Sequence, residues 1–326
     1  MSENLFYNRD RNISGVTTPQ LLSALSLTPS YGSQVEFKAD NTEYVTDNFY
    51  TNRLPLSLNS LSASFTVRYK VNEENAQKLA NFFESKSGHQ ALEFNPDNSG
   101  IYKNISGFCN AYGINFANNQ RFEVAAQIDC NTGPTLLNWS GGCYVNTGVR
   151  KWALGNTYQK YDITYTGINH INKLNNFYYA TADHTTSSPE VDGPTGTAPK
   201  WPQDFFFDPD IGLAPQVEIQ VDELNYKNSF AQRLKTSDNA ATMGLTYTFS
   251  DISERQAKAM LHFLENKGGY RRFKVGITGV TGILPVYNRP KVCYSPQWNH
   301  TWNFFDSNQL QVTLIEDPMG VIPTGT

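Results

Sequence analysis

Two stretches of the chain alternate apolar and polar residues. Residues 62–69 (SASFTVRY) and 244–251 (GLTYTFSD) begin 244 − 62 = 182 positions apart. Their apolar members are Ala63, Phe65, Val67 and Tyr69 in the first stretch and Leu245, Tyr247 and Phe249 in the second. A period of two is typical of a β-strand with one buried face. The sequence therefore predicts two such strands, and the offset matches Phe65 with Tyr247.

A helical pattern follows each predicted strand. Its apolar positions are Ala76, Leu79, Ala80 and Phe83 in the first case and Ala257, Met260, Leu261 and Leu264 in the second. This spacing of i, i+3, i+4 and i+7 gives an α-helix one apolar stripe. Asn72 and Ser253 precede the stripes as good N-cap residues, and Gly88 and Gly268 follow them and suit a left-handed helix end. We expect one amphipathic helix in each place, with solvated charges at its end. Those charges are Glu84, Lys86, Glu265 and Lys267.

The two regions resemble each other beyond these elements. NFFESKSGH (81–89) is similar to HFLENKGGY (262–270), and QVEFKADNTEY (34–44) is similar to QVEIQVDELNY (216–226). Two later segments end at Cys109 and Cys293, which therefore take equivalent places. The sequence thus predicts one unit of strands, a helix and more strands, written twice along the chain.

This repeat divides the chain into five parts. An N-terminal arm (1–30) precedes an N-terminal unit (31–130), and a C-terminal unit (214–318) precedes a short tail (319–326). Residues 131–213 match neither unit, and turn-rich sequence bounds them on both sides, so we expect a separate insert there. The arm contains Leu21, Leu22, Leu25 and Leu27, which suit docking on a neighbouring subunit.

Composition narrows the class of protein. The chain has 20 Phe, 18 Tyr and 5 Trp, and aromatic residues favour half-buried strands, so we expect a mainly β fold. A net charge of −4 with 17% charged residues gives no broad positive field, and we expect no nucleic-acid partner. No run of about 18 apolar residues is present, so no membrane span is expected. The N-terminal sequence MSENLFYNRDRN lacks the apolar run of a signal peptide.

Residues that could carry chemistry do not form complete motifs. The four cysteines, Cys109, Cys130, Cys143 and Cys293, form no C-x-x-C pair, so buried free thiols are expected rather than zinc ligands.

Three further groups fall short in the same way. Asp183 and His184 lie near two serines, but no G-x-S-x-G elbow exists for a hydrolase. The acids of DFFFDPD (204–210) lack the glycine and closing glutamate of a calcium loop. His262 has no second ligand at i+4 and is expected to be a surface or rim histidine. We expect neither enzymatic activity nor a cofactor or metal.

The repeated order of features resembles the minor tail protein M family of lambda-like phages. Those features are an acidic and aromatic strand, a helix ending in FFESKSG or FLENKGG, a strand containing phenylalanine and a late Tyr…Cys segment. The chain departs from the family pattern in two ways. It carries two copies, and FKADNTEY and IQVDELNY replace the usual glycine-containing turn.

The resemblance implies a fold and a role. It implies β-sandwich or split-barrel domains with a flanking helix, joined edge to edge into a ring around the lumen of a phage tail. The expected protein is a structural component of the tail tip or baseplate in the virion, made in the host cytoplasm, with tube, hub and fibre proteins as neighbours. Six chains could form the ring with one unit each, or three chains could form a pseudo-six-fold ring with both units.

The insert is similar to small carbohydrate-binding modules. Its aromatic residues follow the order W…Y…YD…Y…FYYA…H…P…W between Trp152 and Trp201. Sugar-binding modules stack pyranose rings on exposed aromatic faces, and Trp152, Tyr179 and Trp201 are the candidates. The alternative is that these rings form the core of a small domain. A host-glycan recognition protein, with the repeated units as its scaffold, is accordingly the second functional hypothesis.

Overall fold

The computed structural model describes most of both units and part of the insert. The described residues are 27–45, 51–55, 61–94, 96, 101–102, 105–117, 121–131, 149–166, 176–186, 204–210, 216–219, 221–225, 231–235, 241–275 and 291–317. The predicted N-terminal arm up to residue 26 and the tail from residue 318 lie outside them.

The N-terminal unit contains strands, one helix and more strands, in the predicted order. Its elements are β1 (Gln34–Ala39), β2 (Asn41–Val45), β3 (Thr51–Pro55), β4 (Leu61–Asn72), α2 (Glu73–Lys86), β5 (Leu92–Phe94), β6 (Ile105–Phe116) and β7 (Arg121–Asn131). The C-terminal unit follows the same order. Its elements are β13 (Gln216–Ile219), β14 (Val221–Asn225), β15 (Ala231–Lys235), β16 (Ala241–Ile252), α4 (Glu254–Lys267), β17 (Phe273–Val275), β18 (Lys291–Phe304) and β19 (Ser307–Glu316).

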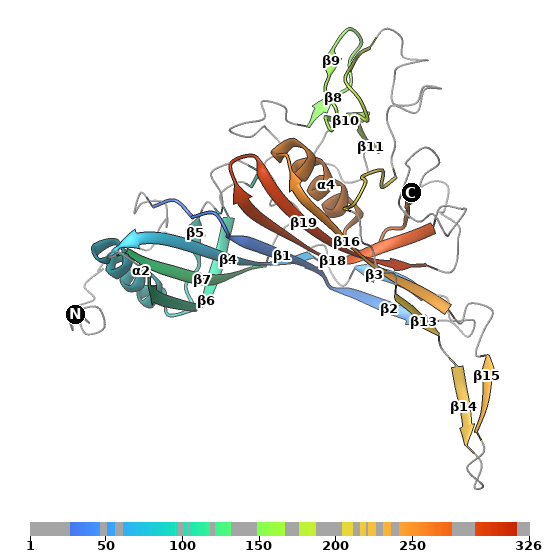
Figure 1. Ribbon diagram of the computed structural model, residues 1–326, viewed down its shortest axis with the longest axis horizontal. Helices are drawn as coiled ribbons and strands as arrows, with labels where there is room; N and C mark the ends of the chain where they lie inside the picture. The colour runs from blue at the N-terminus through green and yellow to red at the C-terminus, as the bar shows by residue number, and fades with distance from the viewer. Residues whose placement is uncertain are drawn as a thin grey trace.

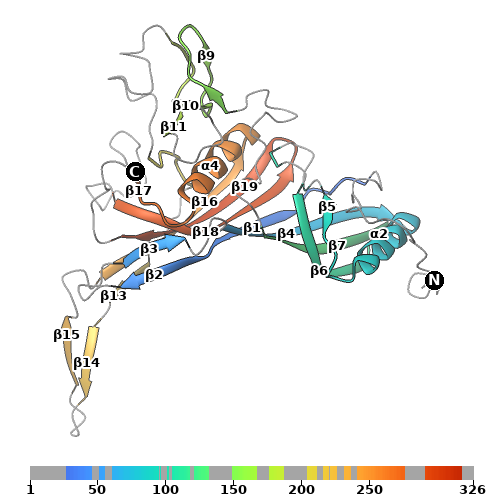
Figure 2. The same cartoon turned by 180° about the vertical axis from the view of Figure 1, so that it is seen from behind.

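Both units contribute to one open sheet of ten strands. Its order is β13-β16-β19-β18-β1-β4-β7-β6-β5, and β17 also pairs with β18 (Figures 1 and 2). The mainly β fold is therefore confirmed. The sequence predicted a separate sandwich or split barrel in each unit, and the structure instead joins the units through β1. This strand pairs with β4 on one edge and with β18 on the other.

One face of the sheet is buried across both units. Directly opposed residues on neighbouring antiparallel strands point to the same face. Val35 is opposite both Phe65 and His300, and all three side chains are buried. The intervening residue Glu36 is exposed, and its neighbour in the register is Asn299, which is half-buried. The alternation read from the sequence thus separates an apolar core from a polar sheet face.

The residues of β4 and β16 that hold equivalent positions in the two units differ from those predicted. Tyr69 is opposite Val124 in the N-terminal unit, and Tyr247 is opposite Val312 in the C-terminal unit. The register therefore matches Tyr69 with Tyr247, an offset of 178 residues rather than 182. A shift of four residues leaves a period of two unchanged, so the alternation alone could not detect it. The helix caps Asn72 and Ser253 are offset by 181, so three extra residues precede α4, and the irregularity in β16 after Phe249 accounts for one of them.

Both helices begin at the predicted caps and α4 ends at the predicted glycine, whereas α2 ends at Ser87, one residue before Gly88. The side chain of Asn72 accepts a hydrogen bond from the backbone N–H of Asn75, and Ser253 accepts one from Gln256. Each helix ends at a left-handed residue, Ser87 in α2 and Gly268 in α4. The predicted apolar stripes are buried in a core cluster that contains residues of both units.

Two of the predicted solvated charges are buried instead. Lys86 of α2 and Glu265 of α4 are almost inaccessible. His262, expected at the surface or rim, is also buried, because the insert covers α4. The sequence of a helix does not show which distant segment will cover its outer face, so these three positions could not be assigned locally.

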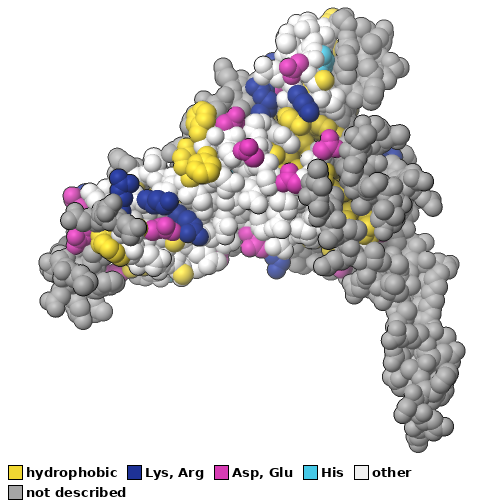
Figure 3. Space-filling model, in the orientation of Figure 1, with side chains coloured by type: hydrophobic (Ala, Val, Ile, Leu, Met, Phe, Trp, Pro, Cys, Tyr) yellow, Lys and Arg dark blue, Asp and Glu magenta, His cyan; other side chains and the backbone are white. Residues whose placement is uncertain are grey.

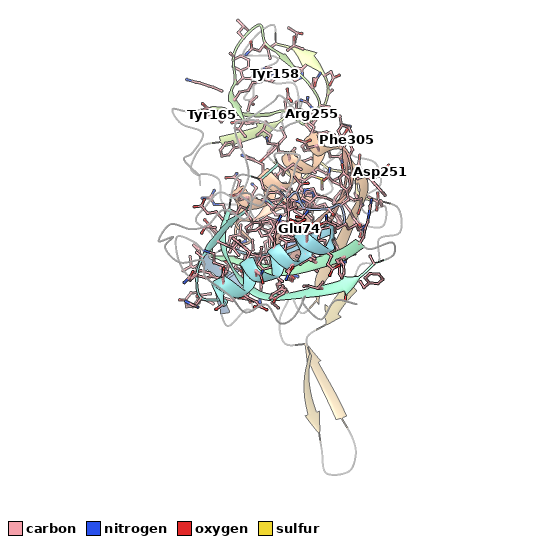
Figure 4. All side chains as sticks on the ribbon, turned by 90° about the vertical axis from the view of Figure 1, so that its left-hand side faces the viewer. Glu74, Tyr158, Tyr165, Asp251, Arg255 and Phe305 are labelled. Carbon is pink, nitrogen blue, oxygen red and sulfur yellow. The ribbon has the colours of Figure 1, made fainter. Side chains whose placement is uncertain are left out.

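The described part of the insert contains short strands, of which β11 packs on α4 through Phe177 and Tyr179. The short strands are β8 (Arg150–Lys151), β9 (Thr157–Tyr158), β10 (Ile163–Thr166), β11 (Asn176–Tyr179) and β12 (His184–Thr185). Asp162, which is buried, accepts hydrogen bonds from Arg150 of the insert and from Arg255 of α4. Figure 4 shows Arg255 at the border between the insert, marked by Tyr158 and Tyr165, and the body of the molecule. A buried carboxylate with two arginines anchors the insert to the C-terminal unit.

Replacing either N-cap residue with alanine is expected to lower the free energy of unfolding by about 1 kcal/mol, because one backbone N–H at the helix start loses its acceptor. The variants are Asn72→Ala and Ser253→Ala, measured by urea unfolding. Ser85→Ala, inside α2, is the matched control and should change stability by less than about 0.5 kcal/mol. Equal effects at positions 72 and 85 would contradict the capping role.

Candidate assembly interface

The junction between the two units is a strand ladder inside one chain. Gln34 to Lys38 of β1 lie opposite Thr301 to Gln297 of β18 in antiparallel register. A strand edge that is left unpaired is a template for another chain. The chain itself therefore contains one complete edge-to-edge contact between its two units.

Aromatic side chains fill the core beneath this ladder. Phe37 of β1 stacks on Trp298 of β18, with ring centroids 5.4 Å apart. Tyr102, from the loop that precedes β6, packs edge-on against Trp302 at 5.4 Å. These contacts join residues from both units, so the core is continuous across the junction.

A buried histidine links the two units by hydrogen bonds. The Tyr102 hydroxyl lies 2.9 Å from Nδ1 of His300, and Nε2 of His300 lies 3.1 Å from Oδ1 of Asn308. Because the amide oxygen only accepts, Nε2 carries the proton, and Nδ1 accepts from the tyrosine. Burial lowers the pKa of His300 to about 4, against the smaller opposing effect of the Asn308 hydrogen bond. The imidazole is therefore neutral at pH 7.

Arg53 fastens the β2–β3 hairpin to the C-terminal unit. Its Nε donates to Oε1 of Glu43 at 2.8 Å, and its guanidinium carbon lies 3.3 Å from the ring centroid of Tyr294. One terminal nitrogen lies 3.6 Å from Oδ2 of Asp317, which also accepts a 2.6 Å hydrogen bond from Arg272. The Arg53 side chain is only 9% exposed. A planar cation with stacked and charged partners is the type of contact that arginine makes and lysine does not. We call Arg53 and its partners Glu43, Tyr294 and Asp317, with Arg272, the arginine clasp.

A glycine lets the two units approach closely beside the clasp. Gly269 has a φ of +77°, and a Cβ added there would lie 2.1 Å from Cβ of Ala39. Gly88, at the matching helix end of the N-terminal unit, has a φ of +71°, and its nearest neighbour would be the Cys109 carbonyl oxygen at 3.4 Å. The left-handed glycine after the helix is therefore buried in the C-terminal unit and exposed in the N-terminal unit.

Strand registers identify the positions in the N-terminal unit that correspond to this junction. Cys109 is opposite Ile128, and Cys293 is opposite Glu316, which gives offsets of 184 on β6 and β18 and 188 on β7 and β19. Gly113 opposite Ala125 and Gln297 opposite Thr313 give the same two offsets. Both strand pairs also contain an irregularity between these points. The two sheet regions therefore share their register.

Positions covered in the C-terminal unit are exposed in the N-terminal unit. His300 is fully buried, whereas Phe116, 184 residues earlier, is 72% exposed. Trp298 is buried and Ile114 is half-buried. β5 covers only Ile105 to Gly107 of β6, and the described strands leave the later residues of that edge unpaired. At the other end of the sheet, β13 corresponds to β1, and among the described strands it pairs with β16 only.

A further apolar patch lies elsewhere on the surface. Figure 3 shows hydrophobic side chains at the surface near the turn between β18 and β19, where Phe304 and Phe305 are exposed. Tyr31 lies 6.1 Å from Phe304 between ring centroids.

Comparisons with known proteins leave the family open. No family model matches the chain. No curated protein matches it either. A solved structure described as the tail protein from Neisseria meningitidis MC58 aligns over 89% of this chain and 98% of that chain, with 10% identity and a TM-score of 0.25. So low a TM-score carries no inference about fold or function. The resemblance to the minor tail protein M family stays a prediction from the sequence.

The predicted carbohydrate residues occupy different environments. Tyr179 is 1% exposed, and its hydroxyl lies 2.9 Å from Nδ1 of His262, so it belongs to the core and has no face free for a sugar. Trp152 is half-buried and packs on a small cluster of insert residues. Trp201 lies outside the described residues. Sugar binding by the insert remains a prediction, with Tyr179 removed from it.

The other candidates for chemistry take structural roles or remain apart. Asp183 accepts a hydrogen bond from the backbone of Lys160, while the His184 ring stacks on Tyr158. Asp204 accepts from the backbone of Lys274, and Asp210 accepts from Ser250. No group of three or more possible metal-binding side chains occurs within the described residues. In the part of the chain that is described, neither helix is long and apolar enough to cross a bilayer.

Sequence reasoning overlooked the arginine clasp. Its signal was present, because Glu43 and Arg53 recur 180 residues later as Glu223 and Arg233. Each pair is directly opposed in its hairpin. A repeated charge pair within a repeated unit is therefore a feature that could have been found before the structure was known.

Alanine at position 269 is expected to destabilise the protein more than alanine at position 88. Both variants force a side chain into a left-handed conformation at about 1 kcal/mol, but Gly269→Ala also collides with Ala39. We expect an additional loss of about 1–3 kcal/mol in the free energy of unfolding of Gly269→Ala. Measurements on dilute, unassembled protein test this. Equal losses of stability in the two variants would show that Ala39 can move aside without destabilising the protein.

Acid is expected to weaken the junction. The unfolded His300 has a pKa near 6.5 and the folded one about 4, so between these values only the unfolded state binds the proton. Stability is therefore retained above about pH 6.5 and lost as the pH falls towards 4, by about 2–3 kcal/mol. Urea midpoints of the native chain and His300→Gln, compared at pH 7 and 4.5, measure this. The variant should lose less stability on acidification, and parallel losses would contradict the assignment.

Proposed function

We propose that the protein is a non-enzymatic structural component of a bacteriophage tail tip or baseplate that closes head to tail into a ring of three chains. Each chain would supply two units, so the ring would have pseudo-six-fold symmetry. Tube, hub and fibre proteins would be its neighbours in the virion.

The observation that carries this proposal is the double pairing of β1. Within the chain, β1 of the N-terminal unit pairs with β18 of the C-terminal unit. The corresponding strands are β13, at one end of the sheet, and β6, which lies next to the other end strand, β5. In the described part of the chain, one edge of β13 and the residues of β6 after Gly107 on one edge are unpaired. A second chain can therefore join β13 to β6 in the way that β1 joins β18.

The internal ladder fixes the register expected between chains. Val35 is opposite His300 and Phe37 is opposite Trp298. The same offsets place Val217 opposite Phe116 of the next chain and Ile219 opposite Ile114. Both new pairs are apolar, and pairing would cover the exposed Phe116 ring.

A closed ring is the favoured outcome of such a contact. The two edges differ, so the contact is heterologous and generates either a ring or an open filament. If the contact between chains repeats the geometry of the contact within the chain, three chains provide six equivalent junctions. This choice follows from the two units in each chain; a six-chain ring that uses one unit of each remains the alternative form.

The assignment to a phage tail is supported by the sequence pattern. The resemblance to the minor tail protein M family covers residues 31–130 and 214–318, which contain the strands of the shared sheet. That family is expected to form rings through its sheet edges, and the open edges suit this role. The alternative, a host-glycan recognition protein, has lost Tyr179 as a binding residue and gains no support from the described insert.

Lysine at position 116 is expected to abolish assembly and leave the fold intact. Phe116 is 72% exposed, so Phe116→Lys should change the melting temperature of the monomer little. In the ring it would bury a charge against β13 and remove an apolar pair. Native mass spectrometry should give three times 36.6 kDa for the native chain and a single chain for the variant.

Leu154→Lys is the matched control, because Leu154 is an exposed apolar residue of the insert. It should form rings as the native chain does. Rings of Phe116→Lys at native concentrations, or a native chain that stays monomeric in concentrated solution, would count against the proposed ring.

A further inference from the structure

The two hairpins of the chain carry the same charge pair but lie in different surroundings. Glu43 is opposite Arg53 in the β2–β3 hairpin, and Glu223 is opposite Arg233 in the β14–β15 hairpin. The next residue is leucine in both hairpins, Leu54 and Leu234. The β2–β3 hairpin lies against β18 and β19, where Arg53 forms the clasp. Figure 1 shows the β14–β15 hairpin standing away from the sheet beyond β13.

The receiving side of the clasp also exists twice. Asp317 follows β19, and its backbone N–H bonds the carbonyl of Val292. Asp129 of β7 holds the corresponding position, because it lies opposite Phe108, which matches Val292 at the offset of 184. An aspartate therefore stands at the same place in the sheet of each unit.

The aspartate of the N-terminal unit is more open than its counterpart. The Asp317 side chain is 1% exposed and contacts two arginines, Arg53 and Arg272. Asp129 is half-buried and accepts hydrogen bonds from Ser64 and Asn110, and no lysine or arginine within the described residues forms an ion pair with it. The apolar residue opposite the aspartate is likewise more exposed in the N-terminal unit than in the C-terminal unit.

Val292 is 7% exposed, whereas Phe108 is 38% exposed. Gly88 is also exposed, whereas the corresponding Gly269 is covered by Ala39. Gly88 lies against the carbonyl of Cys109, the residue after Phe108, and Phe108 is opposite Asp129. These three residues correspond to Gly269, Val292 and Asp317 beside the occupied clasp. We call Asp129, Phe108 and Gly88 the open receptor.

We infer that the open receptor binds the β14–β15 hairpin of the neighbouring chain, with Arg233 meeting Asp129. This inference rests on the proposed ring and names a contact within it. Pairing of β13 with β6 of the next chain would carry the following hairpin towards Asn110 and Asp129, as β1 carries the β2–β3 hairpin towards Tyr294 and Asp317.

The occupant is a second copy of this chain, because the matching hairpin is part of the same sequence. Charge supports the choice, since Asp129, which forms no ion pair with a lysine or arginine of the described residues, would face an arginine. The stacking partner differs. Asn110 replaces Tyr294, so an exposed aromatic face for the guanidinium is available only from Phe108.

A charge exchange between chains tests the contact. Asp129→Arg alone and Arg233→Asp alone should each raise the concentration needed for half-assembly at least tenfold, since like charges then meet at the junction. The double variant Asp129→Arg/Arg233→Asp should recover most of this loss. Asp208→Arg reverses an exposed acid of the insert, and it should assemble as the native chain does.

Two variants of the hairpin itself allow for a folding defect at Asp129. If Asp129→Arg fails to fold because Ser64 and Asn110 lose their acceptor, Arg233→Asp and a variant with residues 222–234 shortened to a turn still report on the hairpin. Normal rings from both of these variants would overturn the inference. If both hairpin variants form normal rings and Phe116→Lys does not, the strand contact between chains is supported and only the contact of Arg233 with Asp129 is ruled out. Loss of assembly in both single variants without recovery in the double variant would also count against the pairing of Arg233 with Asp129.

Discussion

The structure depends on one strand that is hydrogen-bonded along both edges. β1 has β4 of its own unit on one side and β18 of the other unit on the opposite side. Because a strand has only two edges, this arrangement consumes the free edge of β1 and that of β18 together. Within the described residues, the edges left unpaired are then that of β13 and the part of the β6 edge that β5 does not cover. The number of open edges does not fall with each added unit, and only closure removes them.

Buried polar groups make the internal junction specific. Tyr102, His300 and Asn308 form a hydrogen-bonded chain inside an aromatic core. A shift of one residue in the β1–β18 ladder would turn Val35 and Phe37 to the other face of the sheet. It would also separate the loop of Tyr102 from His300 and leave buried donors and acceptors unpaired, which is costly. The aromatic rings supply contact area, and the histidine fixes which rings meet.

Local features of this fold could be predicted from the sequence, and non-local ones could not. Asn72 and Ser253 were predicted as helix caps because capping depends on neighbours three residues away. The burial of the stripe at Ala76 and Ala257 follows from the helical period alone. In contrast, the pairing of Gln34 with Thr301 joins residues 267 positions apart, and no periodicity encodes it.

The errors at the candidate sites have the same origin. Tyr179 is a candidate for sugar binding with a core role as the alternative, because aromatic residues suit cores and sugar platforms equally well. Only its contact with His262 shows which role it takes. Glu265 was expected in solvent because nothing in α4 reveals that the insert lies over it. The arginine clasp was missed because only part of it is close in sequence. Glu43 and Arg53 face each other in one hairpin, but their role depends on the distant Tyr294 and Asp317.

Fusion of two units in one chain changes what the remaining contact must accomplish. The β1–β18 contact is intramolecular, so the linking segment supplies a high effective concentration for it. The contact between chains has no such help and must overcome the loss of translational and rotational freedom. Backbone pairing alone discriminates poorly, because any free strand edge can receive any other. A charge pair placed beside the ladder would favour one partner and one register, since a slipped or foreign strand would leave Asp129 facing no cation. Specificity of this kind is needed most where a heterologous contact could otherwise propagate into a filament.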